Sequence, residues 1–140
     1  MIQYFSFYDE FSDKKAWNLR LIFCEENILI EGNTEAIRRI LQNIIKNALV
    51  HGSQKIRMKL FSENNDIIFL CENDLENPGD IDIKKIFSKF YKADTARTSN
   101  TTGLGLSIAK SLVERMDGTI IAEIENDMFL IRVMFFRKKL

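Results

Sequence analysis

Three polar residues recur at a regular interval in the first half of the chain. Asn43, Asn47 and His51 are each four residues apart, which places them one above another along one face of a helix. Asparagine is mildly unfavourable inside a helix, because its side chain competes for backbone hydrogen bonds. An amide oxygen is a neutral ligand that suits Mg²⁺, which keeps most of its waters and bridges phosphates. The spacing is consistent either with a magnesium and phosphate site or with half-buried asparagines that bond neighbouring loops.

A glycine pair, Gly103 and Gly105, stands before another apolar pattern in the last third of the chain. Glycines at the start of a helix let backbone N–H groups approach an anion, and the helix dipole attracts the negative charge. A tight entry turn would need the same glycines. The polar stretch 93–102 in front of them carries Arg97 and several hydroxyl groups. We therefore predict a mobile lid over phosphates there, since phosphoryl transfer depends mainly on positioning and charge stabilisation.

Two further groups of polar residues are weaker candidates for a site. Residues 72–74 follow an apolar strand and could bond a ligand at its exit, although an ordinary polar turn would look the same. Lys89 and Lys92 are three residues apart on a short predicted helix, from which either could reach a phosphate. A serine-nucleophile site is excluded because no strand–turn–helix elbow presents a serine beside His51, the one histidine. A zinc site is excluded because the two cysteines lack ligand spacing.

The hydrophobic pattern predicts the elements that carry these residues. A helix begins at Asn33 or Thr34, either of which can cap it, and ends at Gly52. The later strands pair as hairpins, which predicts an α+β fold: a two-layer sandwich with about three helices on one face of a mixed, mostly antiparallel sheet. Further helices are predicted over 83–92 and 103–116, and strands over 19–24, 28–30, 55–61, 67–71, 119–125 and 128–136.

The composition fits one globular domain. The chain has 140 residues, of which 46% are hydrophobic, and this supplies enough apolar material for a core. Twenty basic residues balance twenty acidic ones, which argues against a general nucleic-acid or membrane-surface binder. No apolar run approaches the roughly 20 residues of a membrane span, and the start of the chain lacks the features of a signal peptide. Cys24 and Cys71 lie in apolar runs and are expected to be buried free thiols.

Three short runs, taken together, resemble the sequence boxes of sensor histidine kinases. Residues 43–48 (NIIKNA) are similar to the N-box, residues 86–94 (IFSKFYKAD) to the F-box, and residues 102–110 (TGLGLSIAK) to the G2-box. Order and spacing agree over about 33–136, most of the chain. Three boxes in order are far more specific than any one of them. The chain therefore resembles the ATP-binding catalytic domain of these kinases, within the wider group of Bergerat-type ATPases.

This resemblance implies the Bergerat fold, the cofactors ATP and Mg²⁺, and roles for the matched positions. Asn47 would bind Mg²⁺, with Asn43 beside it near the phosphates as the second catalytic residue. Residues 94–102 would form the lid over ATP, and Lys92 fills a place where the family often has an arginine that meets phosphate. The nucleotide-binding residues expected in this way are Asn47, His51, Asn73, Lys92, Arg97, Thr102, Gly103, Leu104, Gly105 and Leu106.

Several positions depart from the family's pattern. The run 73–77 (NDLEN) stands where the G1-box usually begins with aspartate and contains two glycines. Asn73 takes the place of that aspartate, and its amide oxygen can still accept a hydrogen bond from an adenine amino group, without the charge. Leu75 and Asn77 replace the glycines, and His51 stands where an aromatic residue is common. A variant subgroup or a weakened ATP site would explain these differences.

The resemblance also implies partners that this sequence does not contain. Histidine kinases phosphorylate a histidine on a separate helical dimerisation domain, whereas His51 falls inside the predicted pocket. We therefore expect a catalytic fragment, with 1–18 as the remnant of the connection and 19–140 as the ATP-binding domain. Its partners would be the histidine-bearing domain of the same protein and a downstream response regulator, with no nucleic acid and no direct membrane contact. The fragment would be cytoplasmic, and its parent anchored in the cell membrane.

Two other functions stay open on the sequence. An anti-sigma-factor-like serine kinase shares the fold and has some likeness to 47–52 (NALVHG). That group usually needs an acidic base one turn before the asparagine, where this chain has Asn43. The second alternative is a nucleotide-poor module that regulates a partner kinase, which would follow from the altered G1 loop.

Overall fold

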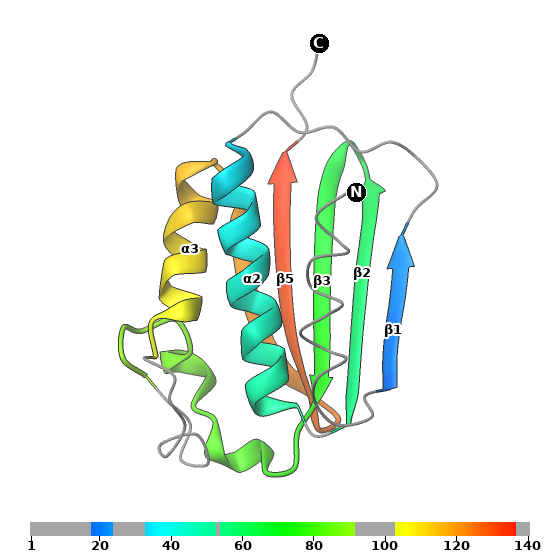
Figure 1. Cartoon of the computed structure of the whole chain (residues 1–140), viewed down its shortest axis with the longest axis vertical. Coiled ribbons are helices and arrows are strands. Elements are labelled where there is room, and N and C mark those ends of the chain that lie inside the picture. Colours follow the sequence, from blue (N-terminus) through cyan, green and yellow to red (C-terminus); the bar gives the residue numbers. More distant parts are fainter. Residues whose placement is uncertain (1–17, 24–32, 53, 92–102, 137–140) are drawn as a thin grey trace.

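The computed structural model describes residues 18–23, 33–52, 54–91 and 103–136. In these ranges two α-helices form one layer against a five-stranded sheet, which is the two-layer α+β sandwich predicted from the sequence (Figure 1). β1 is parallel to β2 and the other neighbours are antiparallel, so the sheet is mixed and mostly antiparallel. The strands are β1 (Asn18–Phe23), β2 (Lys55–Glu63), β3 (Asp66–Asp74), β4 (Thr119–Glu125) and β5 (Met128–Phe136), in the spatial order β1-β2-β3-β5-β4.

The first described helix, α2 (Thr34–His51), begins and ends where the sequence predicts. Asn33 caps its start, because the Asn33 Oδ1 accepts hydrogen bonds from the N–H groups of Glu35 at 2.9 Å and Ala36 at 3.3 Å. The N–H of Gly52 donates to the Ala48 carbonyl over 2.7 Å and closes the last turn. The apolar stripe is buried, as its three-and-four spacing requires: Ile40, Ile44, Ile45, Ala48 and Leu49.

The second helix, α3 (Gly105–Arg115), lies beside α2 and runs in the opposite direction (Figure 1). It buries Leu106, Ala109 and Val113, the last two with 0% of their surface exposed. The hairpin β4–β5 follows, with the bounds predicted from its alternating pattern. Its inward residues on β5 (Phe129, Ile131, Val133 and Phe135) complete the core between the sheet and the two helices.

The prediction of a helix over 83–92 is wrong. The chain forms one short 3-10 helix, η1 (Pro78–Asp80), and a second, η2 (Ile83–Lys85), followed by turns. Phe90 has a positive φ of 64° and is 71% exposed, so it neither continues a helix nor shares the buried side of Ile86. Of the four periodic apolar residues, three pack against the core and Phe90 points outward, so they do not form one helix face; the three are Ile83, Ile86 and Phe87.

Other predictions meet the structure only in part. β3 extends to Asp74, so residues 72–74 belong to the strand and not to a turn after it. Cys71 is a buried free thiol as expected, and burial raises its pKa to about 12. Cys24, the strand predicted over 28–30 and the connection predicted over 1–18 lie outside the described residues, apart from Asn18 in β1. No helix in the described ranges is long and apolar enough to cross a membrane.

Candidate functional site

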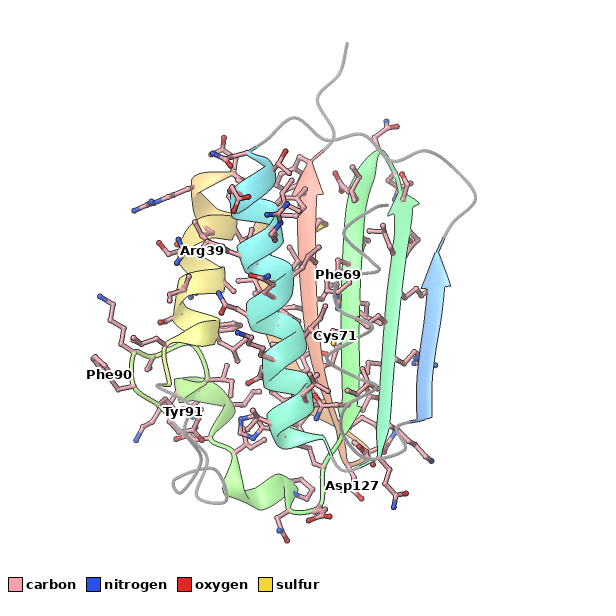
Figure 2. The ribbon with its side chains drawn as sticks, in the orientation of Figure 1. Arg39, Phe69, Cys71, Phe90, Tyr91 and Asp127 are labelled. Carbon is pink, nitrogen blue, oxygen red and sulfur yellow. The ribbon has the colours of Figure 1, made fainter. Side chains whose placement is uncertain are left out.

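The polar residues predicted from the sequence gather at one end of the molecule. α2 reaches this end at His51 and β3 reaches it at Asp74, while the β4–β5 turn brings Asp127 to the same edge (Figures 1 and 2). The N–H of Leu75 donates to the Asp127 carbonyl over 2.9 Å, which fastens the loop after β3 to this turn. Residues from three distant parts of the sequence therefore meet at this end of the sandwich.

The Asn43 side chain of α2 faces the start of α3. A side-chain carbon placed on Gly105 would lie 3.5 Å from the Asn43 Oδ1, so the two residues are close neighbours. Asn47 and His51 follow Asn43 at one-turn intervals along the same face of α2, and all three are half-buried. The predicted pairing of early amide groups with late glycines is therefore present at Asn43 and Gly105.

The start of α3 has free hydrogen-bonding capacity. Leu104 occupies the position before the first helical residue, and no side chain among the described residues caps the N–H groups of the first turn. No acidic residue stands in that turn, so nothing in it neutralises the positive end of the helix dipole. The Ser107 hydroxyl donates to the Leu104 carbonyl over 2.8 Å, which uses a carbonyl and leaves the N–H groups available. An anion is the ligand that this arrangement suits.

Gly103 has a structural reason to be glycine. Its φ is +73°, and a side-chain carbon there would lie 2.8 Å from the Phe90 carbonyl carbon and 2.9 Å from the Tyr91 backbone carbonyl oxygen. The N–H of Phe90 donates to the Gly103 carbonyl over 3.0 Å. This contact joins the two residues that flank the segment 92–102, with Phe90 and Tyr91 beside the start of α3 in Figure 2. The backbone conformation and the close contacts with Phe90 and Tyr91 thus explain why residue 103 is glycine, independently of any ligand at the start of α3.

Asn73 lies in the middle of the sheet beneath the end of α2. It pairs with Ile56 on one side and Phe129 on the other, and 1% of its surface is exposed. Its Nδ2 donates to the Asp74 backbone carbonyl over 3.0 Å, and no other described residue is seen to bond its amide. Because the Nδ2 is the donor of this amide, the Asn73 Oδ1 is its one atom able to accept a hydrogen bond.

His51 is held neutral at the last turn of α2. Burial lowers its pKa from the ordinary 6.5, because a charged imidazole would lose its hydration there. A neutral imidazole offers one donor and one acceptor. His51 can therefore contact an uncharged, planar ligand group more readily than a phosphate.

The described residues fit a magnesium ion that is bound mainly through a phosphate. They contain no group of three or more His, Cys, Asp or Glu side chains that could hold a metal by themselves. The amides of Asn43 and Asn47 are neutral oxygen ligands, and Mg²⁺ commonly takes one or two protein ligands together with phosphate and water. The donor set therefore suits the ion only when phosphate is present.

Some predicted residues lie outside the described ranges, and some functional neighbours were not predicted. Lys92, Arg97 and Thr102 are outside, as is the predicted lid, whereas Leu104 and Leu106 stand at the start of α3 as expected. Sequence reasoning missed Asp74 as a residue that bonds the start of β2, since that contact depends on strand register. It also missed the contact of Phe90 with Gly103, for which the glycine before a helix was the one available signal.

Known proteins share this sequence pattern and fold. A family model described as "Histidine kinase-, DNA gyrase B-, and HSP90-like ATPase" matches residues 32–134. The sensor protein VanS of Enterococcus faecium is 32% identical over 126 residues, which cover 81% of this chain and 30% of VanS. The sensor histidine kinase CpxA of Escherichia coli is 33% identical over 94 residues, covering 66% of this chain and 21% of CpxA. The chain thus spans about a third or less of the length of these relatives.

Solved structures agree with the fold. The catalytic domain of the histidine kinase ThkA superposes with a TM-score of 0.77 at 21% identity, covering 96% of this chain and 88% of that domain. The mycobacterial sensor histidine kinase MprB gives a TM-score of 0.78 at 14% identity, with 96% of this chain and 91% of that chain covered. At these identities the similarity establishes a shared architecture.

Proposed function

Because the chain belongs to the family of histidine kinase-, DNA gyrase B- and HSP90-like ATPases, we propose that it is the ATP-binding catalytic domain of a sensor histidine kinase. It binds Mg-ATP between α2 and the start of α3, and it delivers the γ-phosphate to a histidine on another domain. The observation that carries this proposal is the approach of Asn43 to Gly105 beside a helix start without a side-chain cap. The names of VanS and CpxA, which are sensor proteins, support the assignment.

Different residues of the site bind the phosphates and the metal ion. The free N–H groups at the start of α3, over Gly103, Leu104, Gly105 and Leu106, donate to the phosphates. Asn43 and Asn47 supply amide oxygens on the facing helix, and Asn47 holds the metal ion. When bound, Mg²⁺ neutralises charge that develops on the phosphates during transfer. We also propose phosphate contacts for three residues that lie in sequence between Tyr91 and Gly103: Lys92, Arg97 and Thr102.

The base of the nucleotide belongs at the end of β3. The Asn73 Oδ1 accepts from the amino group of adenine, and neutral His51 packs or bonds beside it. Leu75 and Asn77 stand in place of the family's two glycines, and Leu75 packs against the core while its N–H bonds Asp127. The loop is thus fixed by a bond to the β4–β5 turn and by an apolar anchor, where the family pattern relies on glycine.

The phosphate acceptor lies on a different domain. His51 is half-buried on the helix that lines the pocket, so it is poorly placed to receive a phosphate delivered outward. In the proposed arrangement the segment before β1 leads from the histidine-bearing dimerisation domain. The sequence predicts the boundary between 1–18 and 19–140, but Asn18 already belongs to β1 of the catalytic domain. A response regulator receives the phosphate next, and the parent protein is anchored in the membrane with this domain in the cytoplasm.

Calorimetric titration of the chain with ATP, with and without Mg²⁺, tests the proposal. We expect Asn47→Ala to lower the affinity for Mg-ATP at least about tenfold, equivalent to about 1.4 kcal/mol, because the metal loses its protein ligand. ATP without Mg²⁺ should bind the variant and the unmodified chain alike. Thermal unfolding of both should agree, since Asn47 is not part of the buried core.

Gln42→Ala provides the matched control. Gln42 is a half-buried amide on the same helix, but it lies off the face shared by Asn43, Asn47 and His51. Its affinity for Mg-ATP should equal that of the unmodified chain. Equal affinity of Asn47→Ala would remove the metal role, and an unmodified chain that binds no nucleotide would favour the regulatory module instead.

A further inference from the structure

Asp74 makes contacts that no part of the proposed chemistry requires. The backbone pairing of β2 with β3 ends at Ile56 and Asn73, one residue short of Asp74. Beyond that point the Asp74 carboxylate takes over: its Oδ1 accepts from the N–H groups of Gln54 and Lys55, each at 3.0 Å. Its Oδ2 accepts from the Gln54 N–H at 3.1 Å. The side chain therefore continues the strand pairing with an ionised acceptor.

These bonds fix the chain where it leaves α2. The helix ends at His51, Gly52 closes its last turn, and Gln54 already belongs to the pair of amides that Asp74 holds. Gln54 follows His51 by three residues, and its N–H bonds the Asp74 carboxylate at the end of β3. The position of His51 above the sheet is therefore set partly by Asp74.

The same residue also orients the Asn73 amide. The Asp74 backbone carbonyl accepts from the Asn73 Nδ2 at 3.0 Å, and Asn73 is almost fully buried. The two ends of a carboxamide point in different directions, so holding the nitrogen decides where the oxygen points. A free asparagine could turn and present either a donor or an acceptor to a ligand. Next to the Asp74 carbonyl, Asn73 presents the acceptor.

We propose that Asp74 is a positioning residue: it holds the end of α2 against the end of β3 and restricts Asn73 to accepting a hydrogen bond. The inference rests on the proposed function and adds a reason why an asparagine can serve there. An aspartate can only accept, whereas an asparagine is ambiguous between a 6-amino and a 6-oxo purine. Asp74 removes that ambiguity, so the pocket takes the 6-amino base although it lacks the usual carboxylate.

Titration with ATP and with inosine triphosphate tests this directly, because inosine has an oxygen where adenine has the amino group. We expect the unmodified chain to bind ATP about tenfold more tightly, since the wrong base leaves two acceptors facing each other. Asn73→Asp, which can only accept, should keep a similar ratio. A ratio near one in the unmodified chain, with clear binding of both nucleotides, would overturn the inference while leaving the proposed function intact.

Two variants of Asp74 separate positioning from general stability. Asp74→Ala keeps the backbone carbonyl that accepts from the Asn73 Nδ2 but loses the carboxylate bonds to Gln54 and Lys55. The ratio should fall to within about twofold, because that carbonyl is no longer held in place at the end of β3. Asp74→Asn keeps one acceptor oxygen for the Gln54 and Lys55 amides and should keep most of the preference. A loss of stability alone would lower the affinities for ATP and inosine triphosphate by the same factor. An unchanged ratio of affinities in folded Asp74→Ala would therefore refute the positioning role. If no variant and no unmodified chain binds either nucleotide, the proposed function itself fails.

Discussion

The helices α2 and α3 begin in opposite ways, at opposite ends of the helical layer (Figure 1). At the start of α2, Asn33 accepts hydrogen bonds from two backbone N–H groups, and Glu35 places a negative charge in the first turn. At the start of α3 the described residues supply no side-chain cap, and the first turn holds no acidic residue. The first helix satisfies its own N-terminus, as stability favours. The second lacks such a cap among the described residues, and Asn43 of α2 lies beside its start, where the proposed function places the phosphates.

The largest effect is expected where the start of α3 meets Phe90. Gly103→Ala puts a carbon 2.8 Å from the Phe90 carbonyl carbon, at a φ of +73°. The strained conformation and the collision with backbone together should lower the free energy of unfolding by about 3 kcal/mol. Urea denaturation followed by circular dichroism measures this loss, and nucleotide binding should fall with it.

Gly79→Ala is the control for this change. Nothing lies within 4 Å of a side-chain carbon on Gly79, and its φ is not in the left-handed region. Its stability should stay within about 0.5 kcal/mol of the unmodified chain. A Gly103→Ala variant as stable as Gly79→Ala would mean that the backbone near Phe90 relaxes easily, and the turn would then be no fixed part of the site.

A smaller effect is expected at the other helix start. Asn33→Ala removes the cap of α2 and should lower the free energy of unfolding by about 1 kcal/mol, because two N–H groups lose their acceptor. Affinity of the folded protein for Mg-ATP should not change, since this end of α2 is remote from Asn43 and His51. Denaturation and calorimetry on the same variant separate the two quantities. A parallel loss of affinity would contradict the division of roles between the helix starts.

Local patterns were enough to predict most of the fold. The spacing of Ile40, Ile44 and Ala48 predicts α2, and Asn33 marks its first turn, because both signals involve residues within one helix. The alternation along 128–136 predicts β5 for the same reason. The pattern failed at 83–92, where Phe87 packs against the core but Phe90 points outward from a left-handed turn. Spacing alone does not distinguish a helix from a short 3-10 helix and turn that together pack three apolar residues against the core.

The sequence singles out the candidate residues of the site but not the contacts among them. Asn43, Asn47 and Gly105 could be singled out because helix spacing and glycine pairs leave a mark in the sequence. The bonds of Asp74 to Gln54 and Lys55 join residues about twenty positions apart, and they exist because β2 and β3 pair in one particular register. Nothing local to Asp74 shows that register. The reason for Gly103, a close approach to Phe90, is likewise visible only in three dimensions.

The smallest effect, and the most direct test of the uncapped helix start, is expected at Gly105. A side-chain carbon there would meet the Asn43 Oδ1 at 3.5 Å, an ordinary contact, and its φ is not in the left-handed region. Gly105→Ala should therefore raise the free energy of unfolding by about 0.5 kcal/mol, because the unfolded chain loses freedom.

The same methyl group would stand between Asn43 and the first amides of α3, where the phosphates are proposed to lie. We expect affinity for Mg-ATP to fall about tenfold in this more stable protein, which calorimetry and denaturation measure on one sample. Stability and binding then move in opposite directions, as they must if α3 leaves its first N–H groups to a ligand. If Gly105→Ala raised both the free energy of unfolding and the affinity for Mg-ATP, the phosphates would have to lie elsewhere. The start of α3 would then be an ordinary uncapped helix end.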